Sequence, residues 1–587
     1  MKKIVSVLLV LCFVASFLVS CKPSDKEADL VVYGTIYTAE NENDSVAEAF
    51  AVKDGKYIFV GTKEEAKKYV KEGKTEVIDK TNEGLIIPGC TEGHSHYFGV
   101  YGAGTVLPGQ GLSYKEMLDV IKDEIKEKGV KQFYSYGWKT MELSEEAKEG
   151  KNFAEEIENV APSIPVVLLD NTGHNAVCNT TALKNAGLLE NPSVRGGEIK
   201  LDKDGKPSGL VSDQAVGYLM DNAVKPSLTD EQCKEACVMA MNTLLRQGYT
   251  NAFDAYINQF CEDSLSKTLK KLDEEGELSV NVSSCYNLKS YDADNYKEKV
   301  DRVAEINKDC KSTHYNPGYI KLFADGVVES STGWMLEKYK DVQEGKEYGN
   351  QIWKEEELNK LVEYANSKDI LVHTHTYGDA ACKALLDAYI NSNEKNKNEY
   401  RNCLGHVRNI QNEDIKRAAE NNIPIAENLI WHSDLNDEKP EDKAQKDIIL
   451  SHVSEDTYYS GYPMKSLIDN GVMMSSSTDS PAGMVVEGNI MNVLEVATTG
   501  ITPGDTAKPF SENELLSVRE CLQALTINGA WQLGLEKERG SVKVGKYADF
   551  VVLDKNILNY QGEELRTIHD TKILSTYFEG KPAYLSE

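Results

Sequence analysis

Two histidines, His94 and His96, lie two residues apart at the end of a short apolar run that begins at Ile86. In a β-strand, residues i and i+2 point to the same face, so both imidazoles can enter one cavity. A divalent metal needs this arrangement if a single strand is to supply two of its ligands. Taken alone, the pattern is equally compatible with two ordinary histidines on a surface or in a core. Residues elsewhere in the chain must distinguish these two interpretations.

Further side chains that can bind a metal follow other short apolar runs. They are Lys321, His375, His406 and Asp479. The runs alternate with amphipathic stretches such as residues 355–367 and 380–391, a pattern typical of βα units around a parallel sheet or barrel. A (β/α)8 barrel keeps its chemistry at the carboxyl ends of its strands. We therefore predict an α/β fold with a (β/α)8 TIM barrel over residues 86–535.

Both ends of the chain are rich in short strands broken by glycine. Residues 29–85 include a hairpin pattern with Asp54 and Gly55 at its turn, and residues 536–587 contain similar strands. We predict that the two segments together form one small composite β-sandwich domain. The stretch from about residue 99 to 246 does not fit one βα repeat and is too long for a loop. It predicts an inserted lobe over the barrel mouth.

The first 20 residues have the features of an export signal, because Lys2 and Lys3 precede an apolar run of suitable length. The end of this segment, Leu18-Val19-Ser20-Cys21, resembles a bacterial lipobox, which implies cleavage before Cys21 and acylation of its thiol. Residues 21–28 would then be a polar tether. The alternatives are an ordinary signal peptide and a non-cleaved anchor. We expect an extracytoplasmic protein that is lipid-anchored to the bacterial cell membrane.

Composition narrows the classes of partner. The formal net charge of −29 argues against a nucleic-acid partner, since phosphates would be repelled by such a surface. The 12 cysteines are spread along the chain without the spacing of a small disulfide-rich domain, so most are predicted to be buried free thiols. The oligomeric state stays open, with a homodimer as one alternative.

Taken in order, the polar strand ends resemble those of the metal-dependent amidohydrolase superfamily. The surrounding segments narrow the resemblance to amidohydrolase family 3, a branch typified by a formamide deformylase. The resemblance covers nearly the whole mature chain and implies the same barrel with a composite β-sandwich. Its most specific segments are residues 88–96, 248–255, 320–326, 373–380, 477–481 and 544–549.

The resemblance implies a site for two divalent ions. His94, His96 and Asp479 would hold one ion, and His375 and His406 the other. Lys321 would bridge both ions after its amine takes up carbon dioxide, because an ammonium group cannot ligate a cation. The ligand types favour zinc, with manganese or iron as alternatives.

Two of these residues also have simpler interpretations. Lys321 shares a strand face with Tyr319 and Phe323, so its chain could pass along these rings to reach water. Asp479 could cap a helix that starts at Ser480-Pro481. We favour the metal site for both, because a buried lysine on an apolar strand needs a partner.

The resemblance further implies a hydrolase of a non-peptide C–N bond in a small-molecule amide, N-formyl or N-acyl compound. A metal-bound hydroxide would attack the carbonyl group, and Asp479 would carry the proton to the leaving amine as the catalytic residue. One alternative is a mononuclear deaminase of the same superfamily, which would not need Lys321. The other is a catalytically inactive solute-binding surface lipoprotein. Periodicity cannot separate these functions, since one fold hosts many.

Two residues of the lobe resemble family positions that contact substrate: His174, in the segment 172–179, and Trp138, in Gly137-Trp138. Gly405 departs from the family pattern, because family members usually have a glutamate directly before the ligand on this strand. The segment Lys139-Thr140 also departs, since family members tend to have acids there. Neither departure touches a predicted metal ligand, so both bear on the choice of substrate.

Overall fold

The computed structural model describes residues 27–40, 46–81, 84–138, 151–170, 173, 175–257, 263–340, 342, 344–481 and 486–586. The predicted signal peptide, Cys21 and His174 lie outside these ranges. Within them, no helix combines the length and the apolar character needed to cross a bilayer. Nine cysteines lie in the described ranges, and all of them are buried free thiols, as the sequence predicts.

The centre of the molecule is a parallel barrel, which confirms the predicted fold. Within the described residues it has eight strands in the order β6-β12-β13-β14-β15-β16-β17-β18, and all seven ladders between them are parallel. The strands are β6 (Cys90–Ser95), β12 (Tyr249–Asp254), β13 (Asn281–Asn287), β14 (Tyr315–Phe323), β15 (Leu371–His375), β16 (Cys403–Gly405), β17 (Ile425–Glu427) and β18 (Met474–Ser476).

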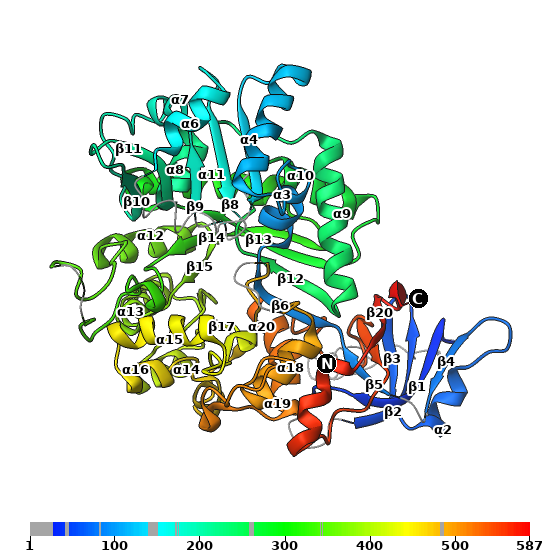
Figure 1. The fold of residues 1–587 in the computed structure, drawn as a ribbon. Coiled ribbons are helices and arrows are strands. Elements are labelled where there is room, and N and C mark those ends of the chain that lie inside the picture. The colour runs from blue at the N-terminus through cyan, green and yellow to red at the C-terminus, as the bar shows by residue number, and fades with distance from the viewer. Residues whose placement is uncertain are drawn as a thin grey trace, which may run out of the picture.

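Helices surround this sheet on its outer side (Figure 1). They include α9 (Asp230–Arg246), α10 (Ser264–Glu274), α11 (Tyr296–Cys310), α12 (Glu355–Ser367), α13 (Asp379–Asn396), α14 (Asn412–Glu420), α15 (Pro440–His452), α17 (Met464–Asp469), α18 (Ile490–Thr499) and α19 (Val518–Gln523). The predicted amphipathic stretches are α12 and most of α13. Helix α12 buries Leu358, Leu361, Val362 and Ala365, the i, i+3, i+4, i+7 spacing of one helix face.

The residues after β18 bring the last strand of the barrel next to the first. The Asp479 amide donates a hydrogen bond to the His94 carbonyl at 2.8 Å. The carboxyl oxygen Oε1 of Glu92 accepts from the Thr478 amide at 2.9 Å and from the His94 amide at 3.2 Å. These bonds nearly close the barrel at the point where two of the predicted metal ligands lie.

The two ends of the chain share one small β-domain, seen beside the barrel in Figure 1. Its strands follow the order β21-β20-β19-β5-β1-β2-β3, and β4 pairs with β1. They enclose a core that includes Phe50, Tyr57, Phe550 and Tyr577. The strands are β1 (Leu30–Tyr37), β2 (Val46–Lys53), β3 (Lys56–Gly61), β4 (Glu76–Lys80), β5 (Leu85–Pro88), β19 (Phe550–Leu553), β20 (Ile573–Phe578) and β21 (Lys581–Leu585).

Gly89 joins this domain directly to the barrel, because it is the single residue between β5 and β6. A Cβ atom at this position would lie 2.2 Å from Thr250 Oγ1 and 2.9 Å from Asp549 Cβ. Such contacts are too short for any side chain to fit without moving its neighbours. The glycine lets strand β6 leave the small domain and enter the barrel beside β12, which sets the position of His94 and His96.

The inserted lobe lies above the barrel in Figure 1 and has a sheet of its own, in the order β10-β11-β9-β8-β7. Phe133, Trp138, Phe153 and Leu168 belong to its separate core. The lobe contains α4 (Tyr114–Asp123), β7 (Phe133–Trp138), α6 (Phe153–Val160), β8 (Val166–Asp170), β9 (Asn175–Cys178), α7 (Thr180–Asn185), β10 (Gly197–Leu201), β11 (Pro207–Asp213) and α8 (Gln214–Asn222).

One histidine ties the barrel to the small β-domain. His314 Nδ1 lies 2.6 Å from Asp273 on α10, and its Nε2 lies 3.0 Å from Glu579 after β20. Two ionised carboxylates can only accept, so both ring nitrogens must carry protons. Although burial lowers the pKa of His314, the hydrogen bonds that its ring donates to Glu579 and Asp273 raise the pKa above its usual value overall.

We therefore expect His314→Gln to destabilise the protein by about 1 kcal/mol. A histidine whose folded pKa is raised stabilises fully below its unfolded pKa of about 6.5, and this stabilisation is lost as the pH rises through the folded value. Urea unfolding from about pH 5 to 9 should show a deficit that shrinks at high pH. His452→Gln is the control, since its ring nitrogen faces the Lys340 carbonyl rather than carboxylates. A deficit of constant size across this range would contradict the doubly protonated ring.

Candidate active site

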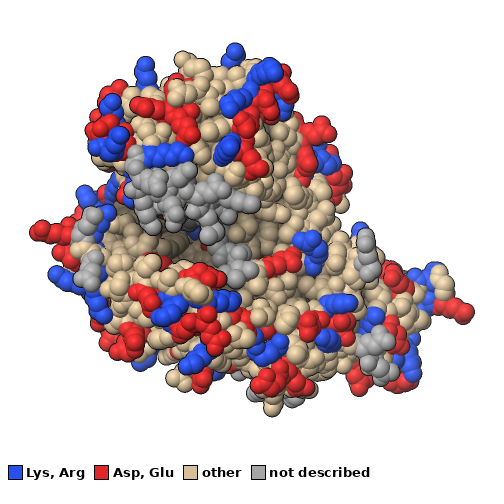
Figure 2. Space-filling model, viewed as in Figure 1, with Lys and Arg blue, Asp and Glu red and all other residues tan. Residues whose placement is uncertain are grey.

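A cavity of about 780 Å³ lies between the mouth of the barrel and the lobe. Figure 2 shows this face of the molecule hollowed between the two parts. The predicted ligands that line the cavity from the barrel are His96, Lys321, His375, His406 and Asp479. Side chains that line it from the lobe include Tyr136, Asn175, Ser212, Asp213 and Gln214. The cavity is therefore open to a molecule held between the barrel and the lobe.

His94, His96 and Asp479 converge at the end of β6. Their ligand atoms all lie within 4.8 Å of one another. Asp479 Oδ1 is 3.0 Å from His96 Nε2 and 3.4 Å from His94 Nε2. Burial raises the pKa of Asp479, but attraction to the protonated forms of His406 and Lys321 and the short polar contact with His96 outweigh it and lower the pKa overall. The carboxylate is thus ionised at neutral pH and faces two imidazoles.

Lys321 on β14 belongs to the same cluster, because its Nζ lies 2.9 Å from His94 Nε2. Its side chain does not reach water past the aromatic rings, since the residue is only 1% exposed. Burial lowers the pKa of Lys321 to about 8. A substantial fraction of the amine is therefore neutral near physiological pH, which is the form that can react with carbon dioxide.

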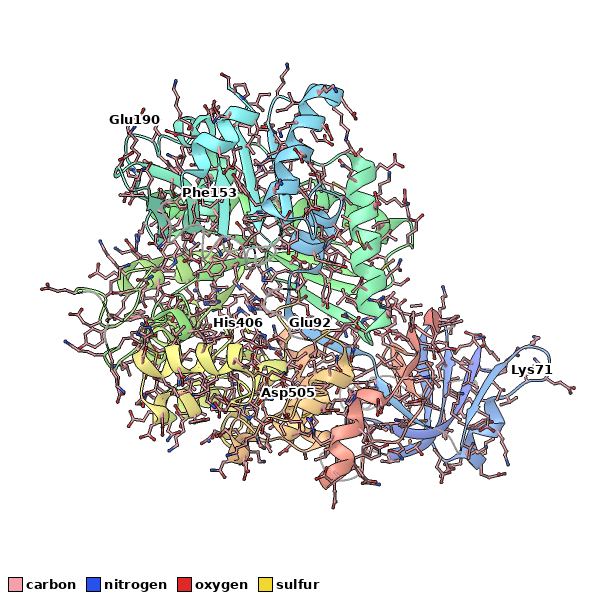
Figure 3. The ribbon with its side chains drawn as sticks, in the orientation of Figure 1. Lys71, Glu92, Phe153, Glu190, His406 and Asp505 are labelled. Carbon is pink, nitrogen blue, oxygen red and sulfur yellow. The ribbon has the colours of Figure 1, made fainter. Side chains whose placement is uncertain are left out.

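His375 and His406 complete the cluster from β15 and from the residue after β16. Their ring centroids lie 5.1 Å apart, and His406 Nε2 is 3.8 Å from Asp479 Oδ1. His406 Nδ1 faces Asn428 Oδ1 at 3.1 Å, which fixes the proton on Nδ1 and leaves Nε2 free to act as a ligand. Burial lowers the pKa of His406 to about 4, so the ring is neutral at neutral pH. Figure 3 places His406 and Glu92 at the centre of the barrel, below the lobe.

His373 contacts the Nδ1 atom of His94, whereas Lys321 contacts its Nε2 atom. The Nε2 atom of His373 lies 2.7 Å from His94 Nδ1, so a proton on Nδ1 leaves His94 Nε2 with a free lone pair that faces Lys321 and Asp479. A Cβ atom on Gly405 would lie 2.9 Å from His94 Nδ1 and 3.0 Å from His373 Nε2. The glutamate that family members usually carry at this position has no room here, because this pair of imidazoles occupies the space.

The structure corrects the expectation that Trp138 contacts substrate. Its side chain is 0% exposed, packs in the lobe core, and donates from Nε1 to the Leu168 carbonyl at 3.0 Å. The ladder between β7 and β8 shifts register between Tyr136 and Trp138, and Gly137 has a φ of +96°. This bulge turns Trp138 away from the face of Tyr136, and Tyr136 lines the cavity instead.

Two buried carboxyl groups that shape the site were not found from the sequence. Asp325 follows β14 and accepts from the amides of Trp334, Tyr377 and Gly378 at 2.8–3.0 Å. Glu92 joins β6 to the segment of Thr478, as described above. Asp325 lies just beyond the end of β14, whereas Glu92 lies within β6. Nothing in the spacing of the sequence separates such supports from ligands.

The donor set fits a divalent metal. Among the described residues, Asp479 Oδ1 has no hydrogen-bond partner, although it is buried, and three imidazole Nε2 atoms lie 3.0–3.8 Å from it. A buried charged oxygen without a hydrogen bond is costly unless a cation binds it. Neutral imidazoles, a carboxylate and a lysine that can become anionic are suitable ligands for such a cation.

Comparison with known proteins gives a consistent result. A family model described as "Amidohydrolase family" matches residues 76–584. A Bacillus subtilis protein named "Putative amidohydrolase YtcJ" is 26% identical over 555 residues, which cover 94% of this chain and 98% of that protein. The N-substituted formamide deformylase of Arthrobacter pascens is 23% identical over 573 residues, with coverages of 94% and 98%. A solved structure of an uncharacterized metal-dependent hydrolase from Pyrococcus furiosus aligns with a TM-score of 0.65 at 20% identity, covering 90% of this chain and 100% of that one.

The role of Glu92 in closing the barrel leads to a testable difference between two variants. Burial raises the pKa of Glu92 to about 8, so the group is largely protonated at pH 7. Glu92→Gln keeps an acceptor oxygen for the two amides and should cost less than about 1 kcal/mol. Glu92→Ala leaves both buried amides unpaired and should cost about 2–4 kcal/mol, measured by urea unfolding at pH 7. Equal losses in the two variants would show that the charge of Glu92, and not its acceptor oxygen, matters.

Proposed function

We propose that this chain, which belongs to the amidohydrolase family, is a metal-dependent hydrolase of a non-peptide carbon–nitrogen bond in an amide, N-formyl or N-acyl compound. The observation that carries the proposal is the position of Lys321, whose Nζ lies 2.9 Å from His94 Nε2 within the cluster that includes Asp479. A buried amine beside these side chains can bind a metal ion once carbon dioxide has converted it into an anionic ligand. The similarity over nearly the full length of a formamide deformylase supports the kind of bond.

In this proposal His94, His96 and Asp479 would hold one ion, and His375 and His406 would hold a second. Lys321, once carbamylated, would supply a further anionic ligand. The ligand types favour zinc, and manganese or iron would also accept them. When bound, the ions would polarise the substrate carbonyl group and lower the pKa of water near the cluster.

The side chains supply the proton transfer and the orientation. Asp479 is ionised and presents an oxygen to the cavity, so it can accept a proton from the attacking water and deliver it to the leaving amine. His373 and Asn428 face the Nδ1 atoms of His94 and His406. With the ring proton on Nδ1, each Nε2 atom can act as a ligand. The lobe lines the same cavity opposite the barrel mouth.

We also propose that the protein acts outside the cytoplasm, anchored to the cell membrane through a lipid on Cys21, with a small-molecule amide as its substrate partner. The lipobox-like sequence before Cys21 supports this location. Cys21→Ala should move the protein from the membrane fraction to the soluble or uncleaved fraction of its host. A wild-type protein that is soluble, or whose mature form lacks a lipid by mass spectrometry, would contradict the anchor.

Metal content and turnover test the function together. The purified mature protein should contain two equivalents of divalent metal and hydrolyse members of a panel of N-formyl and N-acyl amines, and a chelator should abolish this turnover. Lys321→Ala should lose metal and reduce turnover at least about 100-fold. Added short carboxylic acids should restore part of it, because a free carboxylate can take the place of the carbamate. Intact-mass analysis should find one carbon dioxide on the wild-type chain under non-denaturing conditions.

Lys289→Ala is the matched control for this experiment. Lys289 is another buried lysine of the same cavity, but its Nζ is bonded to Asp221 at 2.7 Å, so this variant should keep both metal equivalents. A Lys321→Ala variant with full activity and one bound metal would favour the mononuclear deaminase. A protein without any metal-dependent turnover would favour the inactive solute-binding protein.

A further inference from the structure

A second, smaller cavity of about 220 Å³ adjoins the first. The two cavities share Tyr377 and Trp431 in their walls. The ring of Trp431 stacks on His406 with centroids 5.5 Å apart, and the ring of Tyr377 lies parallel to His375 at 5.7 Å. The two cavities therefore meet at two aromatic rings that also contact proposed metal ligands.

This smaller cavity, the side pocket, contains a buried guanidinium group that has few hydrogen-bond partners among the described residues. Arg408 is 2% exposed and lines the pocket. Its Nε lies 3.0 Å from Glu329 Oε1, and its Nη1 donates to Asn409 Oδ1 at 3.3 Å. Among the described residues, Nε forms no hydrogen bond of good geometry, and Glu329 is the one carboxylate in contact with this group. Among the described residues, Nη1 is thus the one nitrogen of this guanidinium that forms a hydrogen bond, and its acceptor is a single amide oxygen.

Another buried arginine of the same chain has two carboxylate partners for its guanidinium group. Arg539 is similarly buried, and it bonds two carboxylates, Asp549 and Glu579, at 2.5 Å each. Arg408 contacts one carboxylate, that of Glu329, and it lines a pocket that could hold a second anion. Since a buried donor without an acceptor costs free energy, a ligand that supplies an acceptor would be favoured.

The other residues that line the pocket indicate which further chemical group such a ligand has. The pocket is lined by the rings of Tyr377, Trp431, Tyr458, Tyr462 and Phe510. The guanidinium lies 5.3 Å and 5.4 Å from the ring centroids of Tyr458 and Tyr462. A flat apolar group can pack among these rings. Arg408 is the one basic residue among the described residues that line the pocket. A phosphate would bring more negative charge toward Glu329 than a carboxylate would, so a carboxylate suits this pocket better.

We propose that the side pocket is a subsite for an aromatic carboxylate, and that Arg408 binds its carboxylate group. The substrate would then be an N-formyl or N-acyl amine that also carries an aromatic ring and a free acid group, with the scissile bond in the main cavity. This inference rests on the proposed function for the identity of the scissile bond. The binding of an aromatic carboxylate in the pocket does not require turnover.

Phenylacetate and its neutral analogue phenylacetamide are the probes, and calorimetry on the metal-loaded protein is the measurement. The wild-type protein should bind phenylacetate at least about 10-fold more tightly than phenylacetamide. Arg408→Gln should abolish this preference. Glu329→Gln should strengthen phenylacetate binding several-fold, because it removes the anion that competes for the guanidinium. Arg417→Gln is the matched control, since Arg417 binds Asp387 and Asp414 away from the pocket, and it should leave the preference unchanged.

Glu329→Gln keeps the inference open to refutation even if Arg408→Gln does not fold. A preference that survives Arg408→Gln would place the carboxylate on the metal ions instead and overturn the subsite. Unchanged or weaker phenylacetate binding in Glu329→Gln would overturn it as well, and would leave Arg408 with a packing role against the tyrosine rings.

Turnover separates this inference from the function on which it rests. Matched N-formyl amines with and without a carboxylate on the ring should differ at least about 10-fold in kcat/KM, and Arg408→Gln should remove the difference. Turnover without a carboxylate preference would refute the subsite and leave the hydrolase intact. Arg408-dependent binding of phenylacetate without turnover of any amide would refute the hydrolase and leave the subsite intact.

Discussion

The site depends on the closure of the barrel between its first and last strands. His94 and Asp479 are far apart in sequence, and the hydrogen bond from the Asp479 amide to the His94 carbonyl, 2.8 Å long, places their side chains side by side. Glu92 reinforces this junction through its acceptor oxygen. Asp479 and His406 both adopt a left-handed backbone conformation, with φ of +57° and +62°. Such strain in residues other than glycine is retained where the surrounding structure holds it and the site uses it.

The closed barrel concentrates groups that would not be stable together without a cation. Burial keeps the imidazoles of His94, His373 and His406 neutral, with pKa values below the usual range, and it lowers the pKa of Lys321 as well. The site therefore offers nitrogen lone pairs, an ionised Asp479 and an amine that can be modified. A metal binds all three types of group, whereas an empty site leaves buried polar atoms unpaired. Arg408 in the side pocket is a similar case, because among the described residues its buried Nε forms no hydrogen bond.

The sequence could predict the fold and the convergence of the ligands because both follow from simple rules. Alternating strands and helices produce a parallel barrel, and its carboxyl strand ends meet at one mouth, so His94, Lys321 and His375 had to lie close together. The position of Trp138 could not be predicted, because a bulge at Gly137 reverses the face that strand alternation implies. The space at Gly405 is filled by His94 and His373, a contact between distant segments that no local pattern reveals. Nothing in the sequence distinguishes Arg408 from the other eight arginines until its burial is known.

The most direct test of this account is the anomalous scattering of crystals of the metal-loaded protein, recorded on both sides of the absorption edge of the bound metal. The account predicts two peaks: one among His94, His96 and Asp479, the other beside His375 and His406, with density for a carbamate on Lys321 between them. Metal peaks at other positions, or an unmodified Lys321 bonded to His94 in crystals that contain both equivalents of metal, would contradict it.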